Sequence, residues 1–145
     1  MSDNAVHTAP LASPVHAILL AFPVALYPST LLADVTYLNT AVIQWTNFAQ
    51  WLNAGANLFA GLLLVWALLS FFFGRARHVR GRGTIYLVVL AVMFVAGVIN
   101  AFQHAKDGWS SVGTTGLILS IVCTVLALFA AFLAHARTTW QEVRT

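Results

Sequence analysis

Charged side chains are scarce in this sequence. Asp and Glu together number four and Lys and Arg seven, so only 8% of the 145 residues are charged, whereas a soluble domain carries about a quarter. Hydrophobic residues instead make up 60% of the chain. A compact soluble core of this length could not bury so much apolar surface, which predicts that the lipid bilayer is the solvent. The few basic residues form no extended basic face, so no nucleic-acid partner is expected.

Cysteine occurs once, as Cys123, which excludes an intramolecular disulfide and any CxxC metal or redox motif. The sequence also has no HExxH zinc motif, no phosphate-binding glycine loop and no GxSxG nucleophile elbow. Cys123 itself lies in a long apolar run, where a thiol stays protonated and unreactive. We therefore expect no metal site and no catalytic activity from the chain on its own.

Four long apolar segments dominate the chain, at about residues 15–37, 47–73, 84–104 and 113–135. Each reaches the roughly 20 residues that a helix needs to cross a bilayer. Each must be helical because lipid offers the backbone no hydrogen-bond partners. The connections are short, so neighbouring helices should run antiparallel. The sequence thus predicts an all-α fold, a single domain over residues 1–145 built as an integral membrane four-helix up-down bundle.

The basic residues lie on one side of the predicted bundle. Arginines cluster between the second and third segments and recur in the C-terminal tail, at Arg75, Arg77, Arg80, Arg82, Arg137 and Arg144. The opposite side has only Lys106, next to Asp107. Loops rich in Lys and Arg stay in the cytoplasm. Both termini are therefore predicted to be cytoplasmic, in a multi-pass protein of a bacterial cytoplasmic (inner) membrane.

Polar side chains gather in the half of the bundle away from the arginines. Counting helix turns from the segment ends places six of them there: Asp34, Asn57, Asn100, His104, Asp107 and Ser120. Ionisable groups are costly in a membrane and need a partner or a purpose. We interpret the set as a pocket for a ligand or partner, with Asp34 and His104 as a proton-accepting or ligand-binding pair. The alternative is an interhelical hydrogen-bond network that only holds the bundle together.

Three histidines are candidate haem ligands. His16 begins the first segment and His135 ends the fourth, so both are expected at the inner, cytoplasmic end, whereas His104 is expected near the outer end. Helix bundles can hold haem between histidines of different helices. The candidate cofactors are haem b and a quinone. Against haem, His16 and His135 flank the ends of their helices, and haem needs a buried slot.

Several short motifs of the apolar segments occur together. They are Pro14-Val15-His16, Phe22-Pro23-Val24-Ala25-Leu26 and Asp34 in the first segment, Trp51 and Gly55 in the second, and Gly116-Leu117 with Leu119-Ser120 in the fourth. Together they resemble a bacterial membrane family, domain of unknown function 2231, over about residues 14–135. The sequence departs from the family pattern at Ser13 and Ala21, where histidines are usual. A cofactor bound by those histidines would need His16 or His104 instead.

The resemblance implies a redox setting, because some members look to be fused or neighboured with Rieske iron–sulfur proteins, cytochromes or periplasmic dehydrogenases. We therefore predict a small membrane anchor or electron-transfer subunit that serves a respiratory complex or a periplasmic redox protein. One alternative is a small-solute transporter or channel, which with four helices would require a homo-oligomer. Another is a structural or assembly subunit without a ligand.

Overall fold

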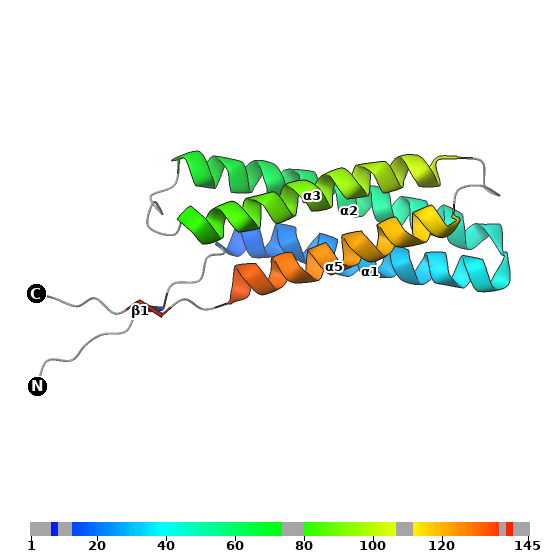
Figure 1. Cartoon of the computed structure of the whole chain (residues 1–145), viewed down its shortest axis with the longest axis horizontal. Coiled ribbons are helices and arrows are strands. Elements are labelled where there is room, and N and C mark those ends of the chain that lie inside the picture. Colours follow the sequence, from blue (N-terminus) through cyan, green and yellow to red (C-terminus); the bar gives the residue numbers. More distant parts are fainter. Residues whose placement is uncertain (1–6, 9–12, 74–79, 107–111, 137–138, 141–145) are drawn as a thin grey trace, which may run out of the picture.

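The computed structural model describes residues 7–8, 13–73, 80–106, 112–136 and 139–140. Nearly all of these residues belong to four long helices (Figure 1). The helices are α1 (Pro14–Thr40), α2 (Ile43–Phe73), α3 (Arg80–His104) and α5 (Thr114–His135). Each is long and apolar enough to cross a membrane. The prediction of an all-α, membrane-spanning four-helix bundle is therefore confirmed.

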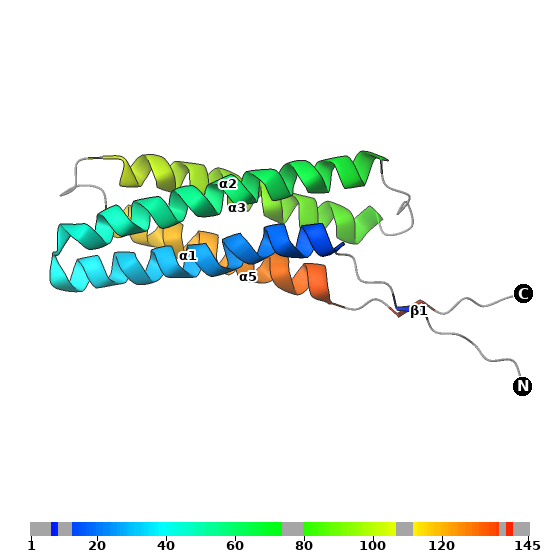
Figure 2. The same cartoon turned by 180° about the vertical axis from the view of Figure 1, so that it is seen from behind.

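The helices lie side by side and alternate in direction (Figures 1 and 2). α1 packs against α2 and α5, and α3 packs against the same two helices. The order around the bundle is therefore α1, α2, α3, α5, so α1 and α3 face each other across the bundle axis. α1 begins and α5 ends at one end, which we call the inner end following the predicted orientation. The opposite end is the outer end.

A short backbone pairing lies beyond the inner end. The strands β1 (His7–Thr8) and β2 (Thr139–Trp140) are antiparallel, with His7 opposite Trp140. This pairing was not among the sequence predictions, since two-residue strands produce no detectable periodicity. It brings the segments that precede α1 and follow α5 together at the same end of the bundle.

The helices α1 and α2 extend beyond the apolar residues that predict them. Asn39 and Thr40 form the last residues of α1, and each side chain donates to the backbone carbonyl one turn earlier, at 2.7 Å. Ala41 then adopts the left-handed conformation, with φ of 54°, and α2 begins two residues later. The sequence of residues 39–46 is compatible with a loop or a short interfacial helix. In the structure most of them belong to the two long helices.

Each helix buries one face at alternating spacings of three and four residues. Such heptad spacing is typical of bundles with a left-handed supercoil. The buried side chains on α2 and α5 are mostly small, so the backbones can approach closely, which stabilises helix packing in lipid. They are Thr46, Ala49, Asn53, Ala56, Ala60, Leu63 and Ala67 on α2, and Gly116, Ser120, Cys123, Ala127, Ala130 and Ala134 on α5.

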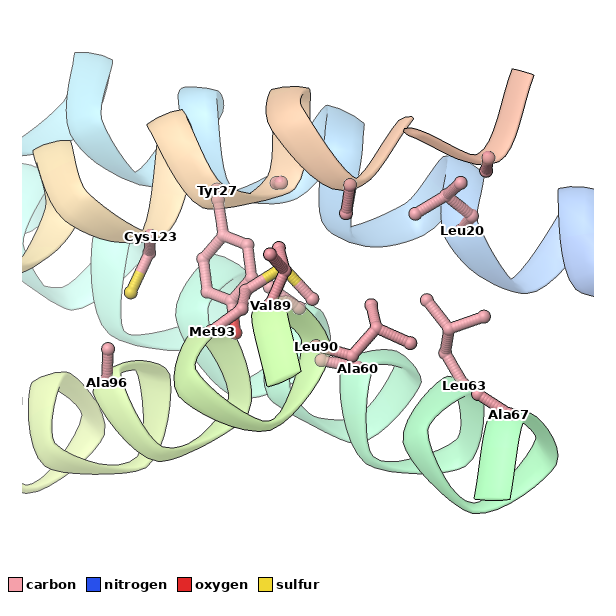
Figure 3. Packing of buried hydrophobic residues seen from close by; sticks show 14 residues of the cluster. Leu20, Tyr27, Ala60, Leu63, Ala67, Val89, Leu90, Met93, Ala96 and Cys123 are labelled. Atoms are coloured by element: carbon pink, nitrogen blue, oxygen red, sulfur yellow. The ribbon is translucent and has the colours of Figure 1, made fainter. Parts of the chain in front are cut away.

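Larger apolar side chains fill the space between the small ones. Figure 3 shows Leu20 and Tyr27 of α1, Leu63 of α2, and Leu90 and Met93 of α3 turned toward the inside of the bundle. All five are at most 1% exposed. The outward faces of the helices instead carry many exposed large apolar side chains. The apolar surface therefore faces lipid, and polar side chains inside the bundle must find their partners on other helices.

Candidate functional site

Asp34 lies on the buried face of α1, at helical spacing from Tyr27, Thr30 and Tyr37. Its side chain is fully buried, with 0% exposure. It precedes the last residue of the helix, Thr40, by six positions (40 − 34), which corresponds to about 9 Å along the axis at 1.5 Å per residue. The carboxyl group is therefore inside the bundle but in its outer half.

His104 ends α3 and faces Asp34 across the bundle axis. Its Nε2 lies 2.8 Å from Asp34 Oδ1, and its Nδ1 lies 2.9 Å from the backbone oxygen of Asn100. A backbone carbonyl only accepts hydrogen bonds, so Nδ1 carries a hydrogen. One further proton then lies between Nε2 and Oδ1. It resides either on His104, which gives an ion pair, or on Asp34, which leaves both groups uncharged. The pair is neutral overall in both forms, which keeps the cost of burying it low.

Ser120 of α5 and Asn100 of α3 complete a closed circuit of hydrogen bonds. Ser120 Oγ donates to Asp34 Oδ2 at 2.5 Å and accepts from Asn100 Nδ2 at 2.9 Å. These two residues are 1% and 0% exposed. We call Asp34, Asn100, His104 and Ser120 the Asp34 network. It joins three helices around one carboxyl group, both of whose oxygens are hydrogen-bonded.

A second polar cluster lies about one turn deeper, around the carbonyl group of Gly97. Asn57 Nδ2 and Asn53 Nδ2 donate to Gly97 O at 2.8 and 3.3 Å, and the Tyr27 hydroxyl donates to Asn57 Oδ1 at 3.1 Å. A Cβ atom on residue 97 would overlap both Asn57 Oδ1 and the Tyr27 hydroxyl, so only glycine allows this approach. We call Tyr27, Asn53, Asn57 and Gly97 the Gly97 cluster. It joins α1, α2 and α3 near the middle of the bundle.

A third polar contact joins α1 to α3 near the inner end. His16 Nε2 lies 2.7 Å from the Tyr86 hydroxyl, and the centroids of the two aromatic rings are 5.3 Å apart. His16 is 6% exposed. His135, on α5, is exposed, and its Nδ1 bonds to the backbone oxygen of Ala131 at 2.9 Å. The two inner-end histidines therefore differ: one is buried in the bundle and the other lies on its surface.

The structure brings together four of the six residues predicted for the outer pocket. Asp34, Asn100, His104 and Ser120 form the Asp34 network. Asn57 instead belongs to the Gly97 cluster. Asp107 lies outside the described residues. The predicted pair of Asp34 and His104 is thus in direct contact, and its other partners come from α3 and α5.

The three candidate haem ligands lie at opposite ends of the bundle. His104 is at the outer end, and both of its ring nitrogens are hydrogen-bonded to protein, which leaves neither nitrogen for iron. His16 and His135 are at the inner end, where only His16 is buried. Among the residues that the structure describes, no group of three or more His, Cys, Asp or Glu side chains could hold a metal ion. The geometry therefore offers no support for haem at His104.

Tyr27, Gly97 and Tyr86 were not among the predicted site residues, yet each makes or permits a buried polar contact. A signal for two of them exists in the sequence, because Tyr27 precedes Asp34 by seven residues and Gly97 precedes His104 by seven. Residues seven apart share one face of a supercoiled helix. A search for polar or small residues at heptad distance from the ionisable ones would have found both.

Asn57 also borders a groove on the outside of α2 and α3. The groove has a volume of about 350 Å³ and is otherwise lined by apolar residues, which are Ala54, Val98, Ala101, Phe102 and Ala105. Ala54 and Phe102 are exposed, so the groove opens on the side that lipid would cover. The Gly97 cluster therefore has one side chain that can be reached from the bilayer.

The chain matches one family model, described as "Predicted membrane protein (DUF2231)", over residues 12–142. No curated protein and no solved structure matches it. The matched region includes all four helices, so the Asp34 network and the Gly97 cluster lie within it.

Proposed function

The chain belongs to the DUF2231 family of predicted membrane proteins, and from this premise we propose that it is a proton-binding membrane subunit of a redox system. In this proposal the pair of Asp34 and His104 takes up and releases one proton in the outer half of the bundle. The redox partner is inferred from the family that the sequence motifs resemble, some of whose members look to be linked to redox proteins. It would be a respiratory complex or a periplasmic redox protein that docks at the outer end.

The observation that supports the proposal is the burial of an acid next to a base. Asp34 and His104 are 0% and 3% exposed, with 2.8 Å between Oδ1 and Nε2. Ionisable residues inside membrane helices are costly and commonly mark proton relays or ligand sites. A network that served only packing could use amides and hydroxyls, as the Gly97 cluster does without any ionised group. The carboxyl group of Asp34 is therefore more than packing requires.

The proposal also fixes the direction of proton exchange. The predicted topology puts six arginines on the inner side and Lys106 on the outer side, so by the positive-inside rule we take the inner end as cytoplasmic. In a bacterial inner membrane, the Asp34–His104 pair would then exchange its proton with the periplasm. This orientation agrees with docking of a periplasmic partner next to the pair.

Electron transfer through haem and solute transport have weaker support. Both ring nitrogens of His104 are already hydrogen-bonded. Between the Gly97 cluster and the inner end, the interior is filled by Leu20, Leu63 and Leu90. A transport path through one copy of the bundle would have to displace these side chains. We therefore favour proton binding coupled to a docked partner.

The substitution Asp34→Asn tests the proposal. An asparagine can accept the Ser120 hydroxyl hydrogen at its oxygen and donate from its amide to His104 Nε2, so the hydrogen-bonded circuit is retained while the exchangeable proton is lost. In protein with ¹⁵N-labelled histidine, reconstituted in lipid, we expect the NMR signal of His104 Nε2 to change with pH in the wild type. In the variant Nε2 should stay unprotonated over the same range.

Ser120→Ala is the matched variant, because it removes one hydrogen bond to Asp34 but keeps the acid–base pair. It should still show the pH-dependent change. An Asp34→Asn protein that fails to accumulate in the membrane would favour a purely structural network. A wild-type pair with no pH response would contradict proton binding, and copurification of a redox protein from native membranes tests the partner separately.

A further inference from the structure

The Asp34 network and the Gly97 cluster each contain one buried amide oxygen that lacks a partner among the described residues. The two oxygens are Asn100 Oδ1 and Asn53 Oδ1, respectively. Both side chains are 0% exposed. Native proteins pair nearly all of their buried polar atoms, and each exception needs an explanation.

Rotation of the amide groups does not supply the missing donors. Turning Asn53 would place its oxygen against Gly97 O, where its amide nitrogen now donates. Turning Asn100 would place its oxygen against Ser120 Oγ, whose hydrogen is already donated to Asp34. Both amide orientations are therefore set by their neighbours, and both oxygens stay without a donor among the described residues.

The two amides also lie at the same level of the bundle. The carbonyl groups of a helix point toward its C-terminus, so Gly97 O points toward the turn of α3 that carries Asn100. Asn53 donates to that carbonyl group from α2. Its side chain therefore lies beside the turn that contains Asn100, whose own amide donates to Ser120 of α5. The two unpaired oxygens thus lie at a similar depth inside the bundle.

We propose that Asn53 Oδ1 and Asn100 Oδ1 bind one water molecule, which joins the Asp34 network and the Gly97 cluster into a single hydrogen-bonded unit. Water is the smallest donor with two hydrogens, and one molecule can donate to both oxygens. Buried waters in proteins commonly bridge polar groups that the protein leaves unpaired. Both oxygens are buried and both lack a donor among the described residues, which is the polar setting that a bridging water occupies.

This inference extends the proposed function, because it links the proton of Asp34 and His104 to the middle of the membrane. From Asp34 the unit continues through Ser120 and Asn100 to the water, and then through Asn53 to the carbonyl group of Gly97. From there it passes through Asn57 to the Tyr27 hydroxyl. A change of charge or hydrogen bonding at the outer pair can therefore reorient groups as far as Tyr27. The unit ends where Leu63 and Leu90 fill the interior.

NMR of protein in lipid nanodiscs tests the water site directly. With ¹⁵N-labelled asparagine, we expect magnetisation transfer from a bound water to the side-chain amide hydrogens of Asn53 and Asn100. The substitution Asn53→Leu should abolish the transfer to Asn100. Thr30→Val is the matched control, because the Thr30 hydroxyl is equally buried but donates only to the carbonyl group of Leu26 on its own helix. It should leave the transfer unchanged.

A second readout tests the link to Tyr27. The Tyr27 ring signals should shift when Asp34→Asn is introduced, and this shift should disappear in the Asn53→Leu background. Absence of water transfer in folded wild-type protein would overturn the water site, whether or not the Asp34–His104 pair responds to pH. A Tyr27 shift that persists without Asn53 would overturn the link. Should Asn53→Leu not fold, Asn53→Ala removes the same oxygen without adding bulk.

Discussion

At the scale of single residues, the Asp34 network pairs hydrogen-bond donors of His104, Ser120 and Asn100 with acceptors inside the same network. Ser120 uses its hydroxyl group once as a donor and once as an acceptor, and each oxygen of Asp34 takes part in one hydrogen bond. His104 is held in orientation at both ring nitrogens. In lipid such bonds contribute on the order of 1 kcal/mol each. Their larger effect is to hold an acid and a base in contact.

Gly97 is the residue whose substitution should disturb the bundle most directly. In Gly97→Ala, the added methyl group would overlap the Tyr27 hydroxyl and Asn57 Oδ1. We expect a loss of about 1–3 kcal/mol in the free energy of unfolding, which is typical of overpacked cores. Reversible unfolding in detergent would measure it. Gly113→Ala is the control, because a Cβ there meets nothing within 4 Å, and comparable losses in both variants would contradict this account.

At the scale of the helices, α1 and α3 differ from α2 and α5 in what they bury. Across the bundle axis, α1 and α3 are connected by polar side chains at the outer and inner ends, through Asp34 with His104 and through His16 with Tyr86. The buried faces of α2 and α5 are mostly small residues. The polar contacts therefore set the relative position of α1 and α3, while the small residues let α2 and α5 approach closely.

Because the buried face of α2 consists mostly of small residues, a larger side chain should be tolerated only on the outward face of this helix. Ala60 is 0% exposed within the core, whereas Ala54 is exposed and lines the groove. Ala60→Leu should push the helices apart and destabilise the protein by about 1–3 kcal/mol. Ala54→Leu should have little effect, since the groove has room. Thermal unfolding of both variants in the same detergent would measure the difference, and equal melting temperatures would contradict the packing model.

At the scale of the whole molecule, orientation in the membrane is open to a direct measurement. Thr40 is exposed at the outer end of α1 and Pro14 at the inner end, while the single native cysteine, Cys123, is buried. Thr40→Cys should react with a membrane-impermeant maleimide in intact spheroplasts, where the periplasmic face is accessible. Pro14→Cys should react only after the membrane is permeabilised. The opposite pattern would reverse the proposed orientation and place the Asp34–His104 pair near the cytoplasm.

The whole molecule is also expected to be colourless. Both ring nitrogens of His104 are hydrogen-bonded, and His16 and His135 lie at the other end of the bundle with only one of them buried. Visible spectra of protein purified in mild detergent, oxidised and then reduced, should therefore show no Soret band that shifts on reduction. A shifting band that is lost in His16→Ala or His135→Ala would contradict this and place haem at the inner end.

Much of the candidate site could be predicted from single residues and their spacing. Asp34 and His104 stand out because ionisable residues are rare in apolar segments, and counting turns places both near the outer end. Heptad spacing also connects Asp34 with Tyr27. Spacing along one helix, however, does not say which helix lies opposite. The pairing of Asp34 with His104 across the axis depends on α1 and α3 being diagonal.

The sequence by itself determined the solvent, the four long helices and the number of spans, because long apolar segments can exist in lipid only as helices. Only the tertiary structure decided the partner of each polar side chain. It assigned Asn57 to Gly97 rather than to Asp34, and it left Asn53 Oδ1 and Asn100 Oδ1 without protein donors among the described residues. The physical reason is that hydrogen bonds between helices depend on rotation and depth to within an ångström, and hydropathy specifies neither.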